Sequence, residues 1–438
     1  MIARMRALTA EARRLWQGKG KNLMQGGLAG VGITLGNRLF TMANSILLAR
    51  LLGSNGYGIY ASAIATMMVL TIVSEFGMYN LLIREVASAH NSDDWPKIAA
   101  LGRTSLLSVT VISLLIGMTG YVLIWRVSLT FDLNEKLALT LVLFLLPINT
   151  LLRLGSAILT GLRRLKSAQL GELFLFPVLL FCTLVTLFAV GIRKWQPDQA
   201  ILAQIGASAG ALILIVLMIR SAFSSNIRVT GGWFVRGLQR RAIPFFAIGA
   251  AGTIAQQIDT VIVSAFLTHQ EVAHYRVASQ AATLTWFGIQ ILQAITAPYF
   301  AGLHQRGARR ALQKVYTWAT ALGILSALPV FLLFVLYGRI LIALAFGQEF
   351  TAAQTPLLII SLGYLLNVAC GPAGTFLSMT GDEVFASRVF IIISSVSVTI
   401  SLALVHLLGA PGVAIGTAFG FASYHLVLRF RIWRTHRF

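Results

Sequence analysis

Twelve apolar stretches, each long enough to cross a lipid bilayer as a helix, follow one another along this chain of 438 residues. A bilayer core about 30 Å thick needs roughly 20 helical residues. Charged residues make up 11% of the sequence, whereas a soluble domain carries about 25%. We therefore predict an all-α polytopic membrane protein with twelve transmembrane helices. The stretches lie near residues 26–51, 57–83, 99–125, 137–162, 167–191, 199–219, 243–267, 275–301, 315–337, 353–379, 385–408 and 411–432.

The distribution of Lys and Arg predicts how these helices are oriented. If the chain begins inside the cell, 26 of its 35 Lys and Arg residues fall in inside segments and 7 in outside segments. An excess of Lys and Arg in short cytoplasmic loops sets the orientation of membrane proteins, so both termini are expected in the cytoplasm. The net charge of +21 does not indicate a nucleic acid as partner, because no basic stripe with interleaved aromatic residues lies on a soluble domain.

A short sequence occurs twice, and the second copy lies 215 residues after the first. Leu51–Ala63 and Phe266–Ala278 are both polar turns between long apolar segments, and Tyr60 aligns with Tyr275. The first predicted span then corresponds to the seventh, and the two have the same orientation. Parallel repeats of this kind are related by an axis along the membrane normal, with a binding site between them. We predict two six-helix lobes around a central cavity.

The repeat and the charge pattern together divide the chain into four parts. Residues 3–16 and 232–241 combine apolar and basic side chains at helical spacing, as in helices that lie on an anionic membrane surface. The predicted parts are a cytoplasmic amphipathic segment at 1–25, an N-terminal lobe at 26–220, a cytoplasmic amphipathic linker at 221–242 and a C-terminal lobe at 243–438.

Charged residues in the middle of a span are costly and face a cavity or one another. Glu75 and Arg153 lie 8 and 9 residues above the inner ends of their spans, so at about 1.5 Å per residue they share one height. The pair could be a structural salt bridge or part of a substrate site, and both interpretations remain open. Arg38 has no partner at its depth, which favours contact with an anionic ligand. Glu172 begins the fifth span and is expected to be solvated.

The C-terminal half has one acid in the middle of a span. Asp259 lies beside Gln256 on a polar helix face, an arrangement suited to binding a proton or Na⁺. The alternative is an acid that is hydrogen-bonded between helices to hold the bundle together. In the next span Arg276 and Gln280 begin a polar stripe that predicts a water-lined surface, and we include both among the expected substrate-binding residues.

Enzyme chemistry has no visible site in this sequence. Beyond the first 25 residues, no segment outside the membrane is large enough for a catalytic domain. The seven histidines show no metal-ligand spacing, and His269 and His274 share an outside turn where solvent exposure is expected. We predict a protein that is not an enzyme, with no metal and no cofactor other than H⁺ or Na⁺ as coupling ion.

Several segments closely resemble the polysaccharide transporter family, the Wzx-type flippases of the multidrug/oligosaccharidyl-lipid/polysaccharide superfamily. They are Ile46–Tyr60, Glu75–Gly77, Leu82–Glu85 and, in the tenth span, Gly371–Gly381. The resemblance implies a V-shaped bundle and a substrate that is an undecaprenyl-diphosphate-linked oligosaccharide. That substrate would move from the inner to the outer leaflet of the bacterial inner membrane for polysaccharide biosynthesis, O-antigen and lipopolysaccharide included, with the polysaccharide polymerase machinery as a partner.

Under that resemblance Arg38 and Arg153 would bind the diphosphate, with Glu75, Arg276 and Gln280 as further substrate contacts, while Asp259 and Gln256 would bind the coupling ion. A drug/cation antiporter of the same superfamily is the nearest alternative and would favour acidic cavity residues. A flippase for the peptidoglycan lipid precursor is a second, although such proteins commonly have extra spans. A membrane-embedded transferase would need a catalytic His or paired acids near one face, and neither is apparent.

Overall fold

The computed structural model describes residues 20–127, 131–191, 195–223, 235 and 237–436, and within these ranges the chain is helical and contains no strand. The first half comprises α2 (Gly20–Glu75), α3 (Met78–Asn91), α4 (Trp95–Val122), η1 (Leu123–Val127), α5 (Leu133–Gly161), α6 (Leu165–Gln169), η2 (Leu170–Leu175), α7 (Phe176–Ala189) and α8 (Pro197–Ala222). The second half comprises α9 (Leu238–Phe266), α10 (His269–Gln305), α11 (Arg309–Ala345), η3 (Gln348–Ala353), α12 (Gln354–Ala369), α13 (Ala373–Met379), α14 (Glu383–Leu408) and α15 (Ala410–His436).

Of the two predicted amphipathic segments, little falls within the described residues. The segment 1–25 lies outside them apart from residues 20–25, and the linker 221–242 lies outside them at 224–234 and 236. These two predictions and the predicted lobe boundaries therefore stay predictions.

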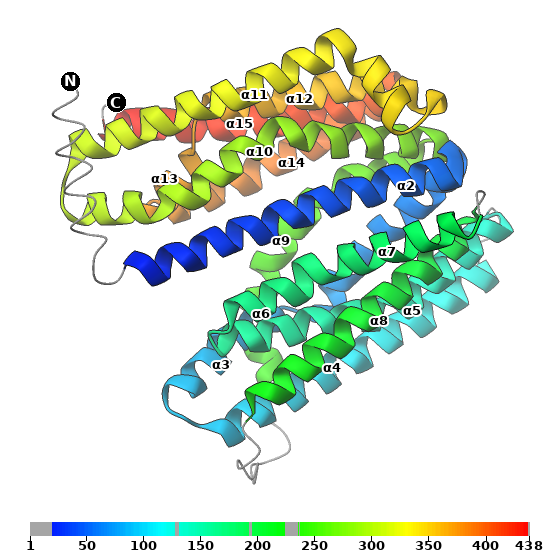
Figure 1. Cartoon of the computed structure of the whole chain (residues 1–438), viewed down its shortest axis with the longest axis horizontal. Coiled ribbons are helices and arrows are strands. Elements are labelled where there is room, and N and C mark those ends of the chain that lie inside the picture. The colour runs from blue at the N-terminus through cyan, green and yellow to red at the C-terminus, as the bar shows by residue number, and fades with distance from the viewer. Residues whose placement is uncertain (1–19, 128–130, 192–194, 224–234, 236, 437–438) are drawn as a thin grey trace.

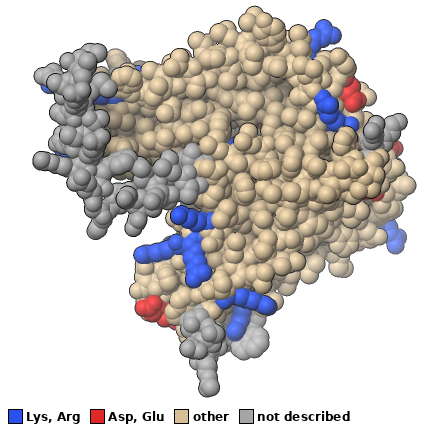
Figure 2. Space-filling view, in the orientation of Figure 1, with Lys and Arg blue, Asp and Glu red and all other residues tan. Residues whose placement is uncertain are grey.

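Nine helices in the described ranges are long and apolar enough to cross a membrane. Helices suit this role because every backbone N–H and C=O finds a partner within its own segment. The predicted all-α polytopic class is confirmed. The predicted number of twelve spans stays a prediction, since Gly32–Glu75 covers the first two and the segments expected in α9 and α10 are not among the nine. The surface agrees with a membrane protein, because Lys and Arg gather near the ends of a largely uncharged face (Figure 2).

The repeated turn interrupts the helices at equivalent positions. In the first copy α2 bends at Gly53, where φ is 69° and ψ is 177°, a conformation open to glycine and strained for other residues. In the second copy the equivalent position, Thr268, separates α9 from α10 and caps α10 by accepting a hydrogen bond from the Glu271 N–H at 3.4 Å. The likeness between the two halves thus extends from sequence to backbone.

The helices form two groups that diverge toward one end of the molecule (Figure 1). Helices α3 to α8 make up one group and α10 to α15 the other. Helices α2 and α9 contact both: α2 packs on α5, α7 and α10, and α9 packs on α2, α3 and α14. The largest apolar cluster joins the groups where they converge and includes Tyr57, Tyr275 and Phe350, whereas separate clusters stabilise each group at the divergent end.

Proline residues interrupt the helices at one place and lie within continuous helices at others. The segment Gly371–Pro372 does end one helix and begin another, because α12 ends at Ala369 and α13 begins at Ala373. Pro147 and Pro298, in contrast, lie within the continuous helices α5 and α10. Proline lacks a backbone N–H but is tolerated within membrane helices where neighbouring groups satisfy the freed carbonyl. In α5, Pro147 removes the N–H that would otherwise bond the Leu143 carbonyl, and the helix continues past it to Gly161.

Candidate functional site

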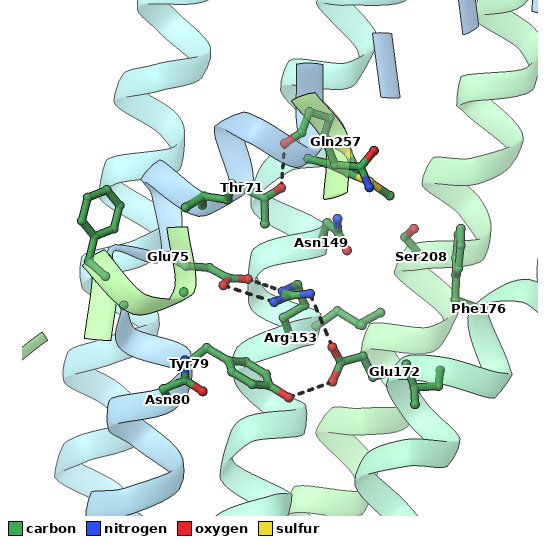
Figure 3. A pocket seen from close by; sticks show the side chains of 18 of the residues that line it. Thr71, Glu75, Tyr79, Asn80, Asn149, Arg153, Glu172, Phe176, Ser208 and Gln257 are labelled. Carbon is green, nitrogen blue, oxygen red and sulfur yellow. Dashed lines mark hydrogen bonds and ion pairs between the residues drawn. The ribbon is translucent and has the colours of Figure 1, made fainter. Parts of the chain in front are cut away.

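A pocket of about 510 Å³ lies among α2, α3, α5, η2, α7, α8 and α9. Ligand pockets in proteins commonly enclose about 300–1,000 Å³. Half of its lining is polar, which is unusual within a bundle made from such an apolar chain. The polar lining residues are Thr71, Glu75, Tyr79, Asn80, Asn149, Arg153, Glu172, Gln204, Ser208 and Gln257 (Figure 3).

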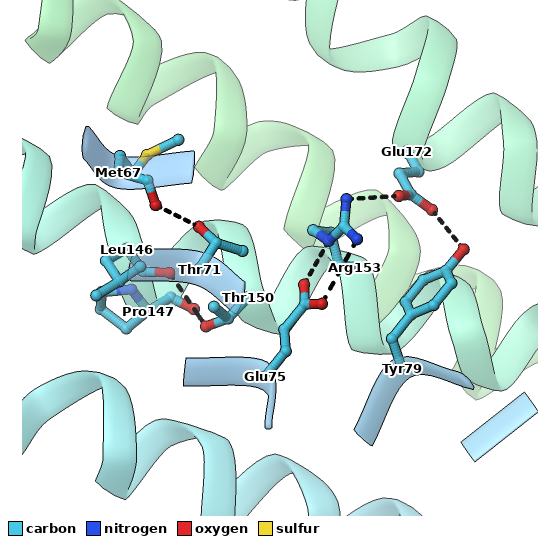
Figure 4. Close-up of polar contacts among 9 residues, drawn as sticks. All are labelled: Met67, Thr71, Glu75, Tyr79, Leu146, Pro147, Thr150, Arg153 and Glu172. Atoms are coloured by element: carbon cyan, nitrogen blue, oxygen red, sulfur yellow. Dashed lines mark hydrogen bonds and ion pairs between the residues drawn. The ribbon is translucent and has the colours of Figure 1, made fainter. Parts of the chain in front are cut away.

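Arg153 stands at the centre of this pocket between two carboxylates (Figure 4). Its Nε donates to Glu75 Oε1, and its Nη2 lies 3.5 Å from Glu75 Oε2. Its Nη1 lies 3.7 Å from Glu172 Oε1. The guanidinium also lies over the Tyr79 ring, with Cζ 5.1 Å from the ring centre, and the Tyr79 hydroxyl donates to Glu172 Oε2 at 3.5 Å. Two acids thus share one cation.

A break between two helices places the first carboxylate and the tyrosine on the same side. Glu75 is the last residue of α2, and Tyr79 lies in the first turn of α3. Between them Phe76 and Gly77 have φ values of 44° and 74°. The ring of Phe76 stacks on Phe246 of α9 with ring centres 5.1 Å apart, which stabilises the break. Glu75 and Tyr79 can therefore both contact the guanidinium on α5.

The position of Glu172 differs from the prediction. This residue lies in the π-helical turn η2, its side chain is 16% exposed, and it faces the pocket rather than solvent. The predicted solvation was wrong because the helix begins earlier, at Leu165 of α6, and so carries Glu172 about two turns inward. Wide π turns inside helices are frequent at functional sites, and here one aims a carboxylate at Arg153.

The equal heights predicted for Glu75 and Arg153 are confirmed, since the two side chains form an ion pair. The sequence missed the rest of the pocket. Tyr79 follows Glu75 by four residues, but the break at Phe76 and Gly77 lies between them, so helical spacing alone could not place it beside the same arginine. The amides of Asn80, Asn149 and Gln257 gave no signal, because isolated amides in apolar spans do not reveal which way they face.

Arg38 does not line this pocket; it lies in α2, the helix that packs on both groups. Its side chain is half-buried, and it forms no ion pair with any residue that the structure describes. An arginine without a carboxylate partner is free to bind an anion bidentately.

Asp259 on α9 is hydrogen-bonded to the helix packed against it. The Thr417 hydroxyl of α15 donates to Asp259 Oδ2 at 2.8 Å, and the Tyr275 hydroxyl of α10 lies 2.9 Å from the same Thr417 oxygen. Among the described residues Asp259 has no cationic partner. The hydrogen bonding between helices, which was the alternative role for Asp259, is present. Binding of a proton or Na⁺ by Asp259 stays a prediction.

The other predicted site residues do not line the pocket. Arg276 lies beside the Tyr57 hydroxyl near the convergent end of the bundle, and Gln280 follows it on α10. The side chain of Gln256 falls outside the described residues. Its neighbour Gln257 does reach the pocket from α9. The structure therefore brings together Glu75 and Arg153 and leaves Arg38, Arg276, Gln280 and Asp259 elsewhere.

A family model described as "Polysaccharide biosynthesis protein" matches residues 23–304, well over half of the chain. The chain belongs to this family. The resemblance seen in the sequence motifs is thereby confirmed. Over 414 residues the chain is 20% identical to the probable low-salt glycan biosynthesis flippase Agl15 of Haloferax volcanii, and the match covers 92% of this chain and 79% of that protein.

Solved structures share the fold of this family member. An inward-facing multidrug transporter of the MATE family has a TM-score of 0.75 at 15% identity, covering 93% of this chain and 98% of the other. An outward-facing MATE family transporter has a TM-score of 0.60 at 14% identity, covering 94% and 96%. The lipid II flippase MurJ in an inward closed conformation has a TM-score of 0.67 at 12% identity, covering 92% and 87%.

At the convergent end of this family member, polar contacts join the two groups of helices. Arg50 of α2 donates to the carbonyl oxygens of Leu344 and Ala345 at the end of α11, the latter at 2.7 Å. The Ser54 N–H donates to Glu349 Oε2 of η3 at 3.1 Å. These contacts lie at the bend of α2, where Gly53 is next to the Glu349 carboxylate.

A second set of contacts extends this closure. His269 at the start of α10 contacts Glu135 of α5, with Nε2 and Oε1 2.5 Å apart. A β-carbon on Gly58 would lie 1.8 Å from the His269 carbonyl oxygen, so only glycine allows α2 and α10 to approach this closely. His274 contacts the Glu349 carbonyl oxygen at 2.9 Å. The two histidines, for which solvent exposure is expected from the sequence, are half-buried in this closure.

At the divergent end α9 is fixed to α3 by a glutamate between two arginines. Glu85 Oε1 lies 2.5 Å from Arg241 Nη2 and 2.9 Å from Arg84 Nη2. Burial raises the pKa of the Glu85 carboxyl, but the hydrogen bonds and charges of the two arginines outweigh it and hold the pKa below its usual value. In the part of the chain that the structure describes, no three His, Cys, Asp or Glu residues are placed to hold a metal ion.

Proposed function

We propose that this chain flips an undecaprenyl-diphosphate-linked oligosaccharide from the inner to the outer leaflet of the bacterial cytoplasmic membrane, for surface polysaccharide biosynthesis. Both termini lie in the cytoplasm in this proposal, and the polysaccharide polymerase machinery takes over the flipped substrate outside. The chain acts as a transporter and performs no covalent chemistry.

The observation that carries this proposal is a polar pocket inside an apolar bundle, in a member of a polysaccharide biosynthesis family. A glycan headgroup cannot cross hydrocarbon without replacing its hydrogen bonds to water. Amides, a hydroxyl and charged groups in the pocket can make such replacements. The Haloferax relative is described as a glycan biosynthesis flippase and MurJ as a lipid II flippase, which supports a lipid-linked glycan as the substrate.

Transport by alternating access fits the two ends of the molecule. The convergent end is closed by Arg50, Ser54 and His269, while the groups diverge at the other end. The TM-score to an inward-facing MATE transporter exceeds that to an outward-facing one, 0.75 against 0.60. The divergence of the helix groups and the higher TM-score to the inward-facing transporter both support an inward-facing state. In that state the substrate headgroup enters from the cytoplasmic side.

Arg38 is the best candidate to bind the diphosphate. Arg153 is already held by two carboxylates, so its charge is compensated before any ligand arrives. Arg38 has no such partner among the described residues and lies on the helix that packs on both groups. A guanidinium can bind phosphate oxygens through two parallel hydrogen bonds. Arg276 and Gln280 would contact the headgroup later, as it moves toward the outer end.

Asp259 is the proposed site of the coupling ion, H⁺ or Na⁺. An ion can drive the cycle only if it binds one state of the bundle better than the other. The hydrogen bond from Thr417 ties Asp259 of α9 to α15, so protonation or Na⁺ binding would change a contact between helices. Gln256 is the proposed second ligand.

A drug/cation antiporter remains a second candidate, and one observation favours it. The pocket holds two carboxylates and one guanidinium, and an excess of negative charge suits a cationic substrate. The MATE fold hosts multidrug transporters. Fold alone does not decide function, so the two candidates need an experiment.

The test is a deletion strain complemented by plasmid-borne variants. The flippase predicts loss of surface polysaccharide on gels, with lipid-linked glycan accumulating on the inner leaflet of spheroplasts. Arg38→Ala should reduce rescue by at least about tenfold, which corresponds to one lost charged hydrogen-bond pair. Arg339→Ala, which changes an exposed arginine on α11, is the matched control. Normal polysaccharide combined with sensitivity to cationic dyes would refute the flippase and establish the antiporter.

A further inference from the structure

The pocket contains an excess of one negative charge. Its charged lining residues in the described part of the chain are Glu75, Glu172 and Arg153. The Arg153 side chain contacts both carboxylates, and the two carboxylates are 9% and 16% exposed. An acidic group that entered this space would find the only guanidinium already bound and would lie near the uncompensated carboxylate.

The remaining polar groups suit a different ligand. Asn149, Ser208 and Gln257 line the same space, and together they offer both donors and acceptors. The Oε1 atom of Gln257 is buried and has no hydrogen-bond partner among the described residues. A sugar hydroxyl can both donate to and accept from side chains of this kind.

Aromatic side chains complete the lining. Tyr79, Phe176 and Phe246 border the pocket on three different elements, α3, α7 and α9. In Figure 3 the labelled rings of Tyr79 and Phe176 lie on either side of Glu172. Apolar faces next to amides and carboxylates can receive a ring that carries C–H groups on its faces and hydroxyls on its rim.

We infer that this pocket accepts a neutral or amino sugar of the lipid-linked glycan and excludes an acidic sugar such as a uronic acid, with Glu172 as the residue that sets this selectivity. The inference rests on the proposed function and names the chemical class of the substrate group. Selectivity of this kind arises from a repulsive element built against the wrong ligand. Glu75 is compensated by its close ion pair with Arg153, whereas Glu172 is the more distant acid, at 3.7 Å, and supplies the excess charge.

The size of the effect follows from Coulomb's law. Two like charges about 7 Å apart at an effective dielectric constant near 20 repel by roughly 2 kcal/mol. This corresponds to a preference of at least about tenfold for the neutral sugar. Removing the charge of Glu172 should abolish most of the preference, and keeping the charge on a shorter side chain should preserve it.

The test uses the full-length protein in lipid nanodiscs and three polyprenyl diphosphates on the same carrier. One carries no sugar, one carries N-acetylglucosamine and one carries glucuronic acid. The wild type should bind the N-acetylglucosamine probe at least about tenfold more tightly than the glucuronic acid probe. Glu172→Gln should reduce this ratio to near one, while Glu172→Asp should retain it. Ser208→Asp adds a second charge and should increase the ratio, which keeps the test decisive if Glu172→Gln fails to fold.

The probes separate two kinds of failure. If the bare diphosphate binds but the wild type does not distinguish the two sugars, or if Glu172→Gln leaves the ratio unchanged, the selectivity is refuted and the proposed function stands. If none of the three probes binds to folded protein, the proposed function fails and this inference fails with it.

Discussion

The backbone N–H of Ser54 on α2 donates to the carboxylate of Glu349 on η3 at 3.1 Å, and this bond joins the two groups of helices where they converge. Arg50 makes two further hydrogen bonds from α2 to the end of α11. The groups can separate at this end only if these contacts break. In an alternating-access cycle, the bond between Ser54 and Glu349 must therefore open once for each substrate.

Cross-linking this contact should stop transport. With Cys182 and Cys370 replaced by Ala, Ser54→Cys and Glu349→Cys joined by a short bifunctional thiol reagent should reduce lipid-linked glycan flipping at least about tenfold. In an alternating-access cycle, the cross-linked protein cannot open at this end. Flipping is measured in proteoliposomes before cross-linking, after cross-linking and, with a reducible reagent, after reduction.

A matched pair within one group controls for this experiment. His274 and Glu349 are in contact at 2.9 Å and both lie in the C-terminal group. Cross-linking His274→Cys to Glu349→Cys should leave flipping nearly unchanged. Full transport by the Ser54–Glu349 cross-linked protein would show that this end does not open.

Removing Arg153 should destabilise the protein more than removing the arginine together with its closest acid. Arg153→Ala leaves Glu75 and Glu172 close together without a cation. Loss of one partner from a buried ion pair costs about 3–5 kcal/mol, and because the Arg153 side chain is 35% exposed we expect about 2 kcal/mol. The double variant Arg153→Ala/Glu75→Gln should recover part of this loss. Thermal unfolding in detergent measures both, and equal melting temperatures for the single and double variants would contradict the pairing.

Part of this site could be predicted from the sequence because charges are so few. Glu75 and Arg153 lie at one height in their predicted spans. Because an unpaired charge inside a membrane is costly, two opposite charges at the same depth are expected to pair. The repeat likewise predicted equivalent backbone breaks at Gly53 and Thr268. In each case the arrangement can be predicted from the sequence, because burying a charge or bending a helix is energetically costly.

Other parts had no such signal. The π turn that aims Glu172 into the pocket depends on packing between helices and on a helix start two residues earlier than expected. The closure by Arg50 uses the carbonyl oxygens of Leu344 and Ala345, and any residue supplies a carbonyl. The direction of a lone amide such as Gln257 is set by the rotation of its helix, which an apolar sequence with little periodicity leaves open.

Asp259 and Thr417 should respond differently to substitution if Asp259 binds the coupling ion. Asp259→Asn keeps an oxygen that can accept the hydrogen bond from Thr417, so the melting temperature should change little while the dependence of flipping on a H⁺ or Na⁺ gradient disappears. Thr417→Val removes the hydrogen bond and should lower the melting temperature but retain the gradient dependence. Flipping in proteoliposomes with imposed gradients measures both. Gradient-dependent flipping by Asp259→Asn would leave Asp259 with a structural role alone.

The contact of Glu85 with Arg84 and Arg241 predicts a pH-dependent contribution to stability. Because the pKa of Glu85 is lowered in the folded protein, its ionised form stabilises the fold above the ordinary carboxyl pKa of 4.5, and this contribution is lost as pH falls through the lower, folded value. The arginine side chains are 55% and 47% exposed, so we expect less than about 1 kcal/mol from the cluster. Glu85→Gln should lower the melting temperature at pH 7, and the difference from wild type should shrink as the pH falls below 4.5.

The matched control for Glu85 is Glu383→Gln, which changes an exposed glutamate at the start of α14. Among the described residues Glu383 has no ion pair, so its substitution should leave the melting temperature nearly unchanged at every pH. Melting curves of the three proteins, measured in one detergent from pH 7 to pH 4, separate a specific contact from the general effect of losing one negative charge. A difference between Glu85→Gln and wild type that stayed constant, or grew, as the pH fell would show that the two arginines do not stabilise the ionised carboxylate.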